Sequence, residues 1–401
     1  MWRHPPREPA RRPVQLPDSR TLIRGSNPRS ASYNGLTSLE HRAGNIPHMN
    51  FSALPSGHLK RLITITAFAL VIALGGCIGS NPPPAGEVPT TTGSGLIEHT
   101  IIVDGNQRQY HLYRPSSVPP DKPIPLVVML HGASGTGEQA ATSYGWMSQA
   151  DRGGFLVAFP SGLKRSWAIT GDCCGPSATE GVDDVGFVVA TVESITQAQR
   201  VDSDRIYVSG ISNGGMLAYR LACETSTFAA VGVVSGTMLG PCPSPQPVSV
   251  IHVHGTADTT LPYAGGPGRR DNQGRGARPV DAAGPPIPEL NEFWRRAESC
   301  GPSQTTGGDP VRIISAQCPM GRSVELLSIE GAGHGWPGSE VSDRAARLLH
   351  LDPPSTAMNA TQVLWEFFEA HPAGTAASSE ARTLPTSTDS PQDAPTARPP
   401  G

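Results

Sequence analysis

The sequence predicts an α/β fold in which a mostly parallel β-sheet carries helices on both faces. Short apolar runs such as residues 124–130 (IPLVVML) have the composition of strands that are buried on both sides. Helical segments alternate with these runs over about 277 residues, a length that is sufficient for one large core. The 45 Gly and 41 Pro among 401 residues make a long coiled coil or a helical bundle an unsuitable alternative.

The expected elements follow one another in order along the chain. Two antiparallel strands are expected at residues 97–103 and 107–113, because a turn sequence at Asp104 and Gly105 separates them. Apolar runs predict further strands at residues 124–130, 155–159, 206–209, 229–234, 248–254 and 324–329. Helices are expected at residues 185–199 (with Asp183 or Asp184 as N-cap), 216–222, 290–296 and 361–369. In such a fold, catalytic groups lie at the carboxyl ends of the parallel strands.

Residues 49–76 have the features of a lipoprotein signal peptide. Lys60 and Arg61 precede an uncharged apolar run at residues 62–76, and small residues lead into Cys77. The four residues that end at Cys77 (LGGC) resemble a bacterial lipobox, whose cysteine becomes lipidated. The apolar run is short for a bilayer-spanning helix, so an uncleaved membrane anchor is the weaker alternative. We therefore expect an exported protein that is lipid-anchored at the cell membrane or envelope, or secreted.

The segments on either side of the expected domain have a biased composition. Residues 1–48 are rich in Arg, Pro and Ser, and they are either disordered or precede a true start at Met49. Residues 77–95 are expected to form a lipidated tether, and residues 373–401 a disordered tail. The domain itself is placed at residues 96–372. The formal net charge is −3, and residues 1–76 carry a net positive charge, so the remainder is acidic and unsuited to nucleic acid.

The cysteine count supports export into an oxidising compartment. Of the seven cysteines, six remain when Cys77 is set aside, an even number that suits three disulfides. Cys300 and Cys318 flank a stretch rich in Gly and Thr and are expected to pair. Two further disulfides of open connectivity are expected among Cys173, Cys174, Cys223 and Cys242. The cysteine and histidine spacings do not fit a zinc site, so no metal is expected.

Residues 210–214 (GISNG) form a G-x-S-x-G sequence centred on Ser212. The motif alone is weak, but here it follows an expected strand at residues 206–209 and precedes an expected helix at residues 216–222. This strand–turn–helix setting is the one that a nucleophile elbow requires, with glycines where neighbouring backbones approach closely. Ser212 is therefore the candidate nucleophile.

A serine nucleophile needs a general base, and the base needs an acid that orients it. Asp258 follows the expected strand at residues 248–254 within the sequence HGTAD, which is the position where the acid of a hydrolase fold is found. Asp271 and Asp281 are rival candidates, but they lie in a loop rich in Gly, Arg and Pro. An ordinary turn-forming role is the alternative for Asp258.

Three histidines follow Asp258 in the chain, and one of them is the candidate base. His334 lies in a glycine-rich loop, residues 331–338 (GAGHGWPG), directly after the last expected strand. His350 and His371 lie in or at the end of helical segments and are interpreted as surface residues. The order Ser, Asp, His along the chain matches that of the hydrolase fold.

The oxyanion of a tetrahedral intermediate needs two hydrogen-bond donors. The backbone N–H groups of Asn213, which follows the nucleophile, and of Ala133, in the loop after residues 124–130, are the candidates. His131 is expected to support this loop. His252 and His254 alternate along one strand and are interpreted as packing groups or as supports behind the catalytic residues.

Six fragments of the sequence resemble a known family of secreted esterases. They are, in order, LHGASG, WAITGDCCG, VDDVGF, GISNGGMLAY, HGTAD and GAGHGWPG. The chain is similar over residues 97–371 to polyhydroxybutyrate depolymerases and to feruloyl or acetylxylan esterases, and within this group to lipoproteins of the LpqC type. The resemblance implies an α/β-hydrolase fold without a large cap domain.

The resemblance also implies roles for particular residues. Ser212, Asp258 and His334 would form the catalytic triad, which agrees with the choice made from the fold. The pair Asp183 and Asp184 would be structural. Two tryptophans flank the site in the order of the motifs and are expected as walls of the substrate site, with core packing as the alternative: Trp167 and Trp336. The long loop at residues 265–288 departs from the pattern and leaves the substrate open.

These observations predict a monomeric serine esterase that uses an acyl-enzyme intermediate and no metal or organic cofactor. The expected partner is a small or polymeric ester, with contact to the membrane only through the lipid anchor. A serine peptidase of the same fold is a less favoured alternative, because no gating domain is evident in the sequence. A non-catalytic envelope-binding lipoprotein is also less favoured, because all three triad residues are present.

Overall fold

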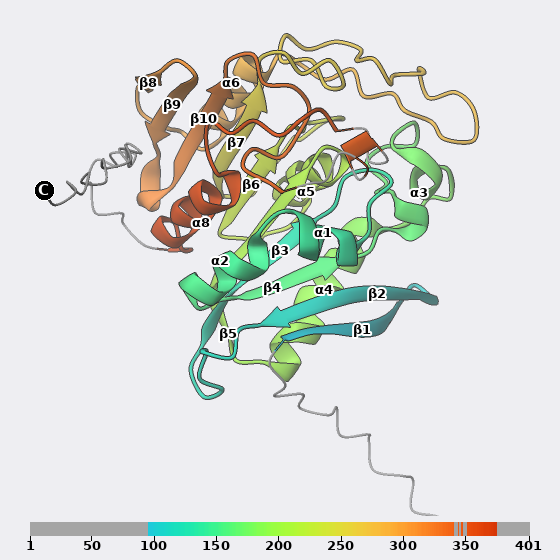
Figure 1. The fold of residues 1–401 in the computed structure, drawn as a ribbon, viewed down its shortest axis with the longest axis vertical. Helices are drawn as coiled ribbons and strands as arrows, with labels where there is room; N and C mark the ends of the chain where they lie inside the picture. The colour runs from blue at the N-terminus through green and yellow to red at the C-terminus, as the bar shows by residue number, and fades with distance from the viewer. Residues whose placement is uncertain (1–94, 341–343, 345, 348–350, 375–401) are drawn as a thin grey trace, which may run out of the picture. The chain divides into compact units, whose positions relative to one another are not determined.

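The computed structural model describes residues 95–340, 344, 346–347 and 351–374 of the chain. Over these residues it contains one ten-stranded sheet in the order β1-β2-β4-β3-β5-β6-β7-β10-β9-β8 (Figure 1). The strands are β1 (Gly95–Val103), β2 (Asn106–Arg114), β3 (Ile124–Leu130), β4 (Leu156–Pro160), β5 (Val201–Ile211), β6 (Ala230–Val234), β7 (Ser249–Gly255), β8 (Gln304–Gly308), β9 (Val311–Gln317) and β10 (Ser323–Ile329).

The middle of the sheet is parallel, as predicted. Strands β4, β3, β5, β6, β7 and β10 are parallel neighbours, so their carboxyl ends share one edge. The antiparallel pairs lie on the two sides, with β1 and β2 beyond β4 and with β9 and β8 beyond β10. Every residue of β3, β6 and β7 is buried, which explains the continuous apolar runs of β3 and β6.

Helices cover both faces of the sheet, which confirms the predicted α/β class. The helices are α1 (Gly137–Ser143), α2 (Trp146–Gly153), α3 (Gly175–Thr179), α4 (Asp184–Ala198), α5 (Asn213–Glu224), α6 (Ile287–Ala297) and α8 (Ala360–Ala370). Apolar side chains of α4, α5 and α6 pack in one core cluster, and those of α1, α2 and α8 pack in a second. Val128 belongs to the first cluster and Val127 to the second, because successive side chains of a strand point to opposite faces.

Five of these elements were not predicted from the sequence: α1, α2, α3, β8 and β9. The helices α1 and α2 are short, and α1 buries only one glycine and two alanines. All five residues of β8 (QTTGG) are exposed, so nothing in their composition distinguishes this edge strand from a loop. The partner strand β9 is only partly buried, and the two form an antiparallel hairpin at the sheet edge.

Three disulfides are present among the described cysteines. Cys300 pairs with Cys318 across the β8–β9 hairpin. The pairing that the sequence left open joins Cys223 to Cys242 and the neighbours Cys173 and Cys174 to each other. Over the described residues, no helix is long and apolar enough to cross a membrane.

The N-terminal predictions lie outside the described residues. These are the extension at residues 1–48, the signal peptide at residues 49–76 and the lipidated Cys77 with its tether. The tail expected from residue 373 onwards is also undescribed beyond residue 374.

Candidate active site

Ser212 occupies a sharp turn between β5 and α5. Its backbone has φ 55° and ψ −121°, a left-handed conformation that an L-residue rarely adopts. A side chain on Gly210 would collide with the backbone of Gly214, and one on Gly214 would collide with the carbonyl of Leu130. The two glycines of the motif are therefore required by close backbone approach, and the strained turn sets Ser212 apart from both the strand and the helix.

A cavity of about 500 Å³ opens beside Ser212. Ala133, Asn213 and Met216 line it around the serine, and further lining comes from residues 164–166, 174–176 and the loop that follows β7. Ser212 is half-buried at this cavity. The volume falls in the range that holds a small ligand or one end of a larger one.

Asp258 and His334 meet at the same edge of the sheet. Asp258 follows β7 and His334 follows β10, and these strands are parallel neighbours. The loops that carry them are joined by a hydrogen bond from the Ala257 N–H to the Ala332 carbonyl at 2.9 Å. The imidazole Nδ1 of His334 lies 2.8 Å from Oδ2 of Asp258, and the two side chains are 1% and 0% exposed.

Two backbone N–H groups and two histidine rings hold the Asp258 carboxylate in place. Its Oδ1 accepts from the N–H groups of Thr260 (2.8 Å) and Leu261 (2.9 Å), while Oδ2 faces His334 and also Nε2 of His254 at 3.3 Å. Burial alone would raise the pKa of Asp258, but hydrogen bonds from His254 and His334 outweigh it and lower the pKa below its ordinary value. Asp258 is therefore ionised, and it keeps the Nδ1 proton of His334 in place.

A chain of buried side chains extends behind Asp258. Tyr219 Oη lies 2.8 Å from Nδ1 of His252, and Nε2 of His252 lies 2.9 Å from Nδ1 of His254. Nε2 of His254 faces only acceptors, namely the Leu261 carbonyl at 2.9 Å and Asp258, so this nitrogen carries a proton. Burial lowers the pKa of His252 well below its ordinary value.

If both imidazole rings are neutral, the hydrogen bonds of this chain can run in only one direction, towards Asp258. Tyr219 donates to His252, His252 donates to His254, and His254 donates towards Asp258. The sequence interpretation placed His252 and His254 among packing or supporting residues, and the geometry assigns them the second of these roles. Tyr219 was not identified, because its contribution depends on a contact between α5 and β7 that no motif encodes.

The structure places Ser212 directly after β5, a strand that is separated from β7 by the single strand β6. Ser212 Oγ makes no hydrogen bond to another described residue, so Asp258 and His334 are in direct contact while Ser212 is not joined to them. Hydrogen bonds of this kind often shorten only when substrate is bound.

Two backbone N–H groups without partners in the described part of the chain lie beside Ser212, one from the start of α5 and one from the loop after β3. A Cβ atom on Gly132 would lie 3.5 Å from Cβ of Ser212, so this loop touches the elbow. Among the described residues, the Ala133 N–H has no hydrogen-bond partner, and the Asn213 N–H opens α5 and has no carbonyl one turn earlier. Both residues line the cavity, which places two free donors beside the serine.

His131 holds this loop in place. Its Nε2 accepts from the Gly162 N–H at 2.9 Å, so the proton is on Nδ1, which donates to the Gly132 carbonyl at 2.8 Å. Burial lowers the pKa of His131 to about 4, and the ring therefore stays neutral at physiological pH.

The two tryptophans expected as walls of the substrate site do not reach it. Trp167 is 0% exposed and Trp336 is 1% exposed, and neither lines the cavity. The prediction was wrong because the indole rings pack into the two core clusters on opposite faces of the sheet. Trp167 instead supports the elbow through its backbone. The backbone N–H of Trp167 donates to Oδ1 of Asn213 at 2.8 Å, and the backbone carbonyl of Trp167 accepts from Nδ2 of Asn213 at 3.0 Å.

Acidic residues outside the candidate triad support the site. Asp352 Oδ2 accepts from the His334 N–H at 2.7 Å, a contact that the sequence offered no motif to find. Asp183 caps α4 by accepting from the Gly186 N–H. Asp184 is buried in an ion pair with Arg108 at 2.6 Å, and it also accepts from the Ala168 N–H beside Trp167. The pair at 183 and 184 thus has the structural contacts that the resemblance implied.

Comparison with known proteins gives the chain a family. The model described as Esterase PHB depolymerase matches residues 108–262, the segment that holds the Ser212 elbow and Asp258. NocK, named as an esterase, from Nocardia uniformis subsp. tsuyamanensis is 28% identical over 313 residues, which cover 70% of this chain and 91% of that protein. Probable feruloyl esterase C from Aspergillus niger is 31% identical over 216 residues, which cover 52% of this chain and 73% of that protein.

Among solved structures, acetyl xylan esterase from Aspergillus awamori is similar with a TM-score of 0.45 and 14% identity, over 63% of this chain and 99% of that one. The sequence relatives, the family match and the α/β-hydrolase arrangement of the sheet agree with one another. The chain belongs to the esterase PHB depolymerase family and is a carboxylic ester hydrolase.

Proposed function

We propose that the protein cleaves carboxylic esters through an acyl-enzyme formed on Ser212, with His334 as general base and Asp258 as the group that orients it. One observation carries this proposal. The strained elbow of Ser212 opens onto a cavity at the same sheet edge where His334 and Asp258 share a buried hydrogen bond.

The proposed reaction has two halves. Nδ1 of His334 donates to Asp258, which leaves Nε2 free to take the proton of Ser212 as Oγ attacks the ester carbonyl. The N–H groups of Ala133 and Asn213 stabilise the oxyanion, and its collapse expels the alcohol, which takes the proton from His334. Water then attacks the acyl-enzyme with the same proton transfers, and the carboxylic acid leaves.

The histidine chain behind Asp258 is expected to contribute to the rate through the orientation and charge of this carboxylate. Replacing His254 with phenylalanine removes one donor from Oδ2 of Asp258 and leaves the others in place. A lost hydrogen bond to a charged group corresponds to about 10- to 100-fold in kcat/KM. The acid limb of the pH–rate profile should move to higher pH, because a less stabilised carboxylate attracts the proton on its partner imidazole more strongly. Steady-state kinetics across pH measure both effects.

Tyr219→Phe is the control, since it removes only the hydroxyl at the far end of the chain. A few-fold loss at most is expected there. A normal rate and an unshifted pH profile for a folded His254→Phe protein would show that the chain serves packing alone.

The esters that we propose as substrates have short acyl groups, hydroxyalkanoate units, feruloyl groups or acetyl groups on glycans. The names of the family and of the relatives support this range, and the fold does not choose within it.

We also propose that the enzyme acts outside the cytoplasm. Three disulfides among the described cysteines support an oxidising compartment. Lipidation at Cys77, the LpqC type of lipoprotein and a monomeric state remain predictions from the sequence.

Covalent trapping tests the proposed nucleophile. An organophosphonate ester is expected to add one phosphonyl group to the purified domain, and peptide mass spectrometry should locate it on Ser212. His334→Ala should slow the labelling strongly, because the hydroxyl then lacks its base. Phosphonylation of a different residue, or equally fast labelling of the His334→Ala protein, would contradict the assignment.

A further inference from the structure

We propose that the cavity beside Ser212 selects esters that carry a free carboxylate, and that Arg270 binds this carboxylate. This inference rests on the proposed function of Ser212, because it assigns a substrate class to the same cavity. Three observations support it: the positive charges that line the cavity, the half-buried guanidinium of Arg270 without a partner among the described residues, and the contacts that anchor its loop.

The lining of the cavity is strongly cationic. Four of its residues are basic and one is acidic: Lys164, Arg165, Arg270 and Arg278 against Asp271. The single carboxylate, Asp271, offsets one of these four cationic charges, and its Oδ1 and Oδ2 accept from the N–H groups of Gln273 and Ala282, so the lining keeps a formal excess of three positive charges. The chain as a whole has a net charge of −3, so this positive cavity is a local feature. A concave site of one sign concentrates ligands of the opposite sign.

Arg270 is the member of this group that is built to receive an anion. Lys164 already pairs with Glu180, and Arg165 and Arg278 are exposed. Arg270 is half-buried, and within the described part of the chain its guanidinium has no ion pair and no hydrogen bond. Burial, together with the neighbouring Arg269, lowers the pKa of Arg270 from its ordinary value. A partly desolvated guanidinium without a partner is costly, and a carboxylate would satisfy it with two parallel hydrogen bonds.

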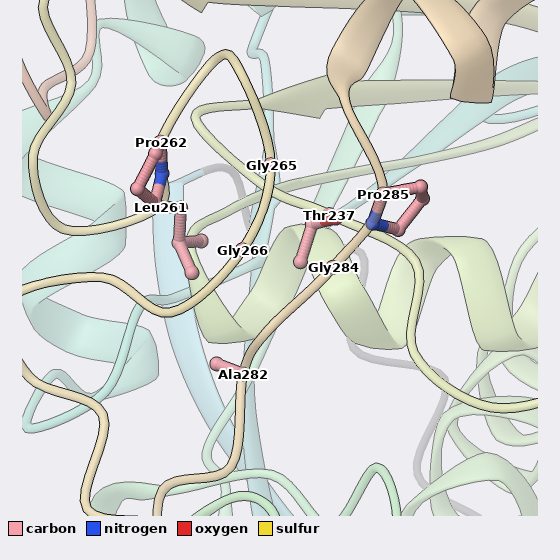
Figure 2. Close-up of a pocket in the computed structure, with 8 residues that line it drawn as sticks. All are labelled: Thr237, Leu261, Pro262, Gly265, Gly266, Ala282, Gly284 and Pro285. Atoms are coloured by element: carbon pink, nitrogen blue, oxygen red, sulfur yellow. The ribbon is translucent and has the colours of Figure 1, made fainter.

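The base of the loop that carries Arg270 is closed by a backbone bridge and by a close contact with a threonine side chain. Gly266 and Gly284 form an antiparallel bridge, and a side chain on Gly284 would collide with Thr237. Figure 2 shows these residues around a small hollow, with Leu261 and Ala282 beside them. Leu261 and Ala282 also line the larger cavity, so the base of the loop adjoins the site of Ser212.

The far part of the loop docks on the segment with the Cys173–Cys174 disulfide. The Gly175 N–H donates to the Pro279 carbonyl at 2.9 Å, and the Asp281 N–H donates to the Asp172 carbonyl at 3.1 Å. Within the loop, the Asn272 N–H donates to the Val280 carbonyl at 2.8 Å. Contacts on both sides of the cavity thus hold the loop, and Arg270 is presented to the cavity by an anchored segment.

Two esters with acyl chains of the same number of carbons test the inference: mono-4-nitrophenyl adipate, which carries a carboxylate, and neutral 4-nitrophenyl hexanoate. We expect the wild type to have the higher kcat/KM for the adipate ester. Arg270→Met should lower kcat/KM for the adipate ester about 10-fold or more, mainly through KM, and leave hexanoate hydrolysis within about twofold. The preference should also weaken with added salt.

Arg275→Met is the matched control, because Arg275 lies in the same loop without lining the cavity. It should leave the ratio of the two substrates unchanged. Equal loss on both esters in Arg270→Met, or a wild type that prefers the hexanoate ester, would overturn the carboxylate site while leaving the esterase intact. Absence of hydrolysis of both esters by the wild type would instead contradict the proposed function itself.

Discussion

Replacing Ser212 with alanine is expected to abolish ester hydrolysis almost completely, with a loss in kcat of at least about 10⁴-fold. The change removes a single oxygen atom. The elbow should persist, because the conformation of residue 212 is imposed by the close approach of Gly210 and Gly214 to their neighbours. Without Oγ, no acyl-enzyme forms, and only the oxyanion donors and substrate binding remain to assist attack by water. Initial rates on a soluble nitrophenyl ester measure the loss.

Ser134→Ala is the matched control for this experiment. Ser134 lines the same cavity and also has a positive φ of 71°, but it lies in the loop after β3. Its replacement should retain activity within a few-fold. If the Ser212→Ala protein kept most of its activity, the nucleophile would have to be another residue, and loss of activity in Ser134→Ala would direct attention to that serine.

The parts of the fold that the sequence predicts well are those in which local pattern and tertiary burial agree. Strands β3 and β6 are buried on both faces, so their apolar runs are unbroken and their identification needs no partner. The elbow is predictable for a similar reason, since Gly210 is required by a contact within the strand–turn–helix unit and Gly214 by the close approach of the neighbouring strand β3. Strand β8 fails this condition, because all its residues are exposed and only pairing with β9 makes it a strand.

The same distinction applies to the site. The contact between Asp258 and His334 could be predicted because each follows a parallel strand, and neighbouring parallel strands bring their ends together. The burial of Trp167 and Trp336 could not be predicted. Both belong to sequence motifs that contain or precede site residues, but a motif does not determine whether a ring points to the cavity or to the core. Arg270 could not be identified from the sequence either, since its proposed role depends on how the loop docks on the far side of the cavity.

Replacing Asp258 with asparagine is expected to lower kcat about 10⁴-fold, and the surrounding hydrogen bonds explain why. The N–H groups of Thr260 and Leu261 require an acceptor, so the amide oxygen of asparagine takes the place of Oδ1. Its NH₂ group then faces the nitrogens of His334 and His254 where an acceptor stood before. His334 would have to accept at Nδ1, which puts its proton on Nε2, the atom that should receive the proton of Ser212.

The stability of the Asp258→Asn protein gives a second, independent measurement. The pKa of Asp258 is lowered in the folded protein, so its ionised form stabilises the fold above the unfolded pKa of about 4, and this contribution disappears as pH falls further. The variant should therefore have a lower Tm than the wild type at pH 7, and the difference should shrink in acid. Asp281→Asn, at an exposed rival position, should change neither kcat nor Tm. A nearly normal kcat for Asp258→Asn would mean that a different carboxylate orients His334, and Asp352, which already holds its backbone, would be the next residue to replace.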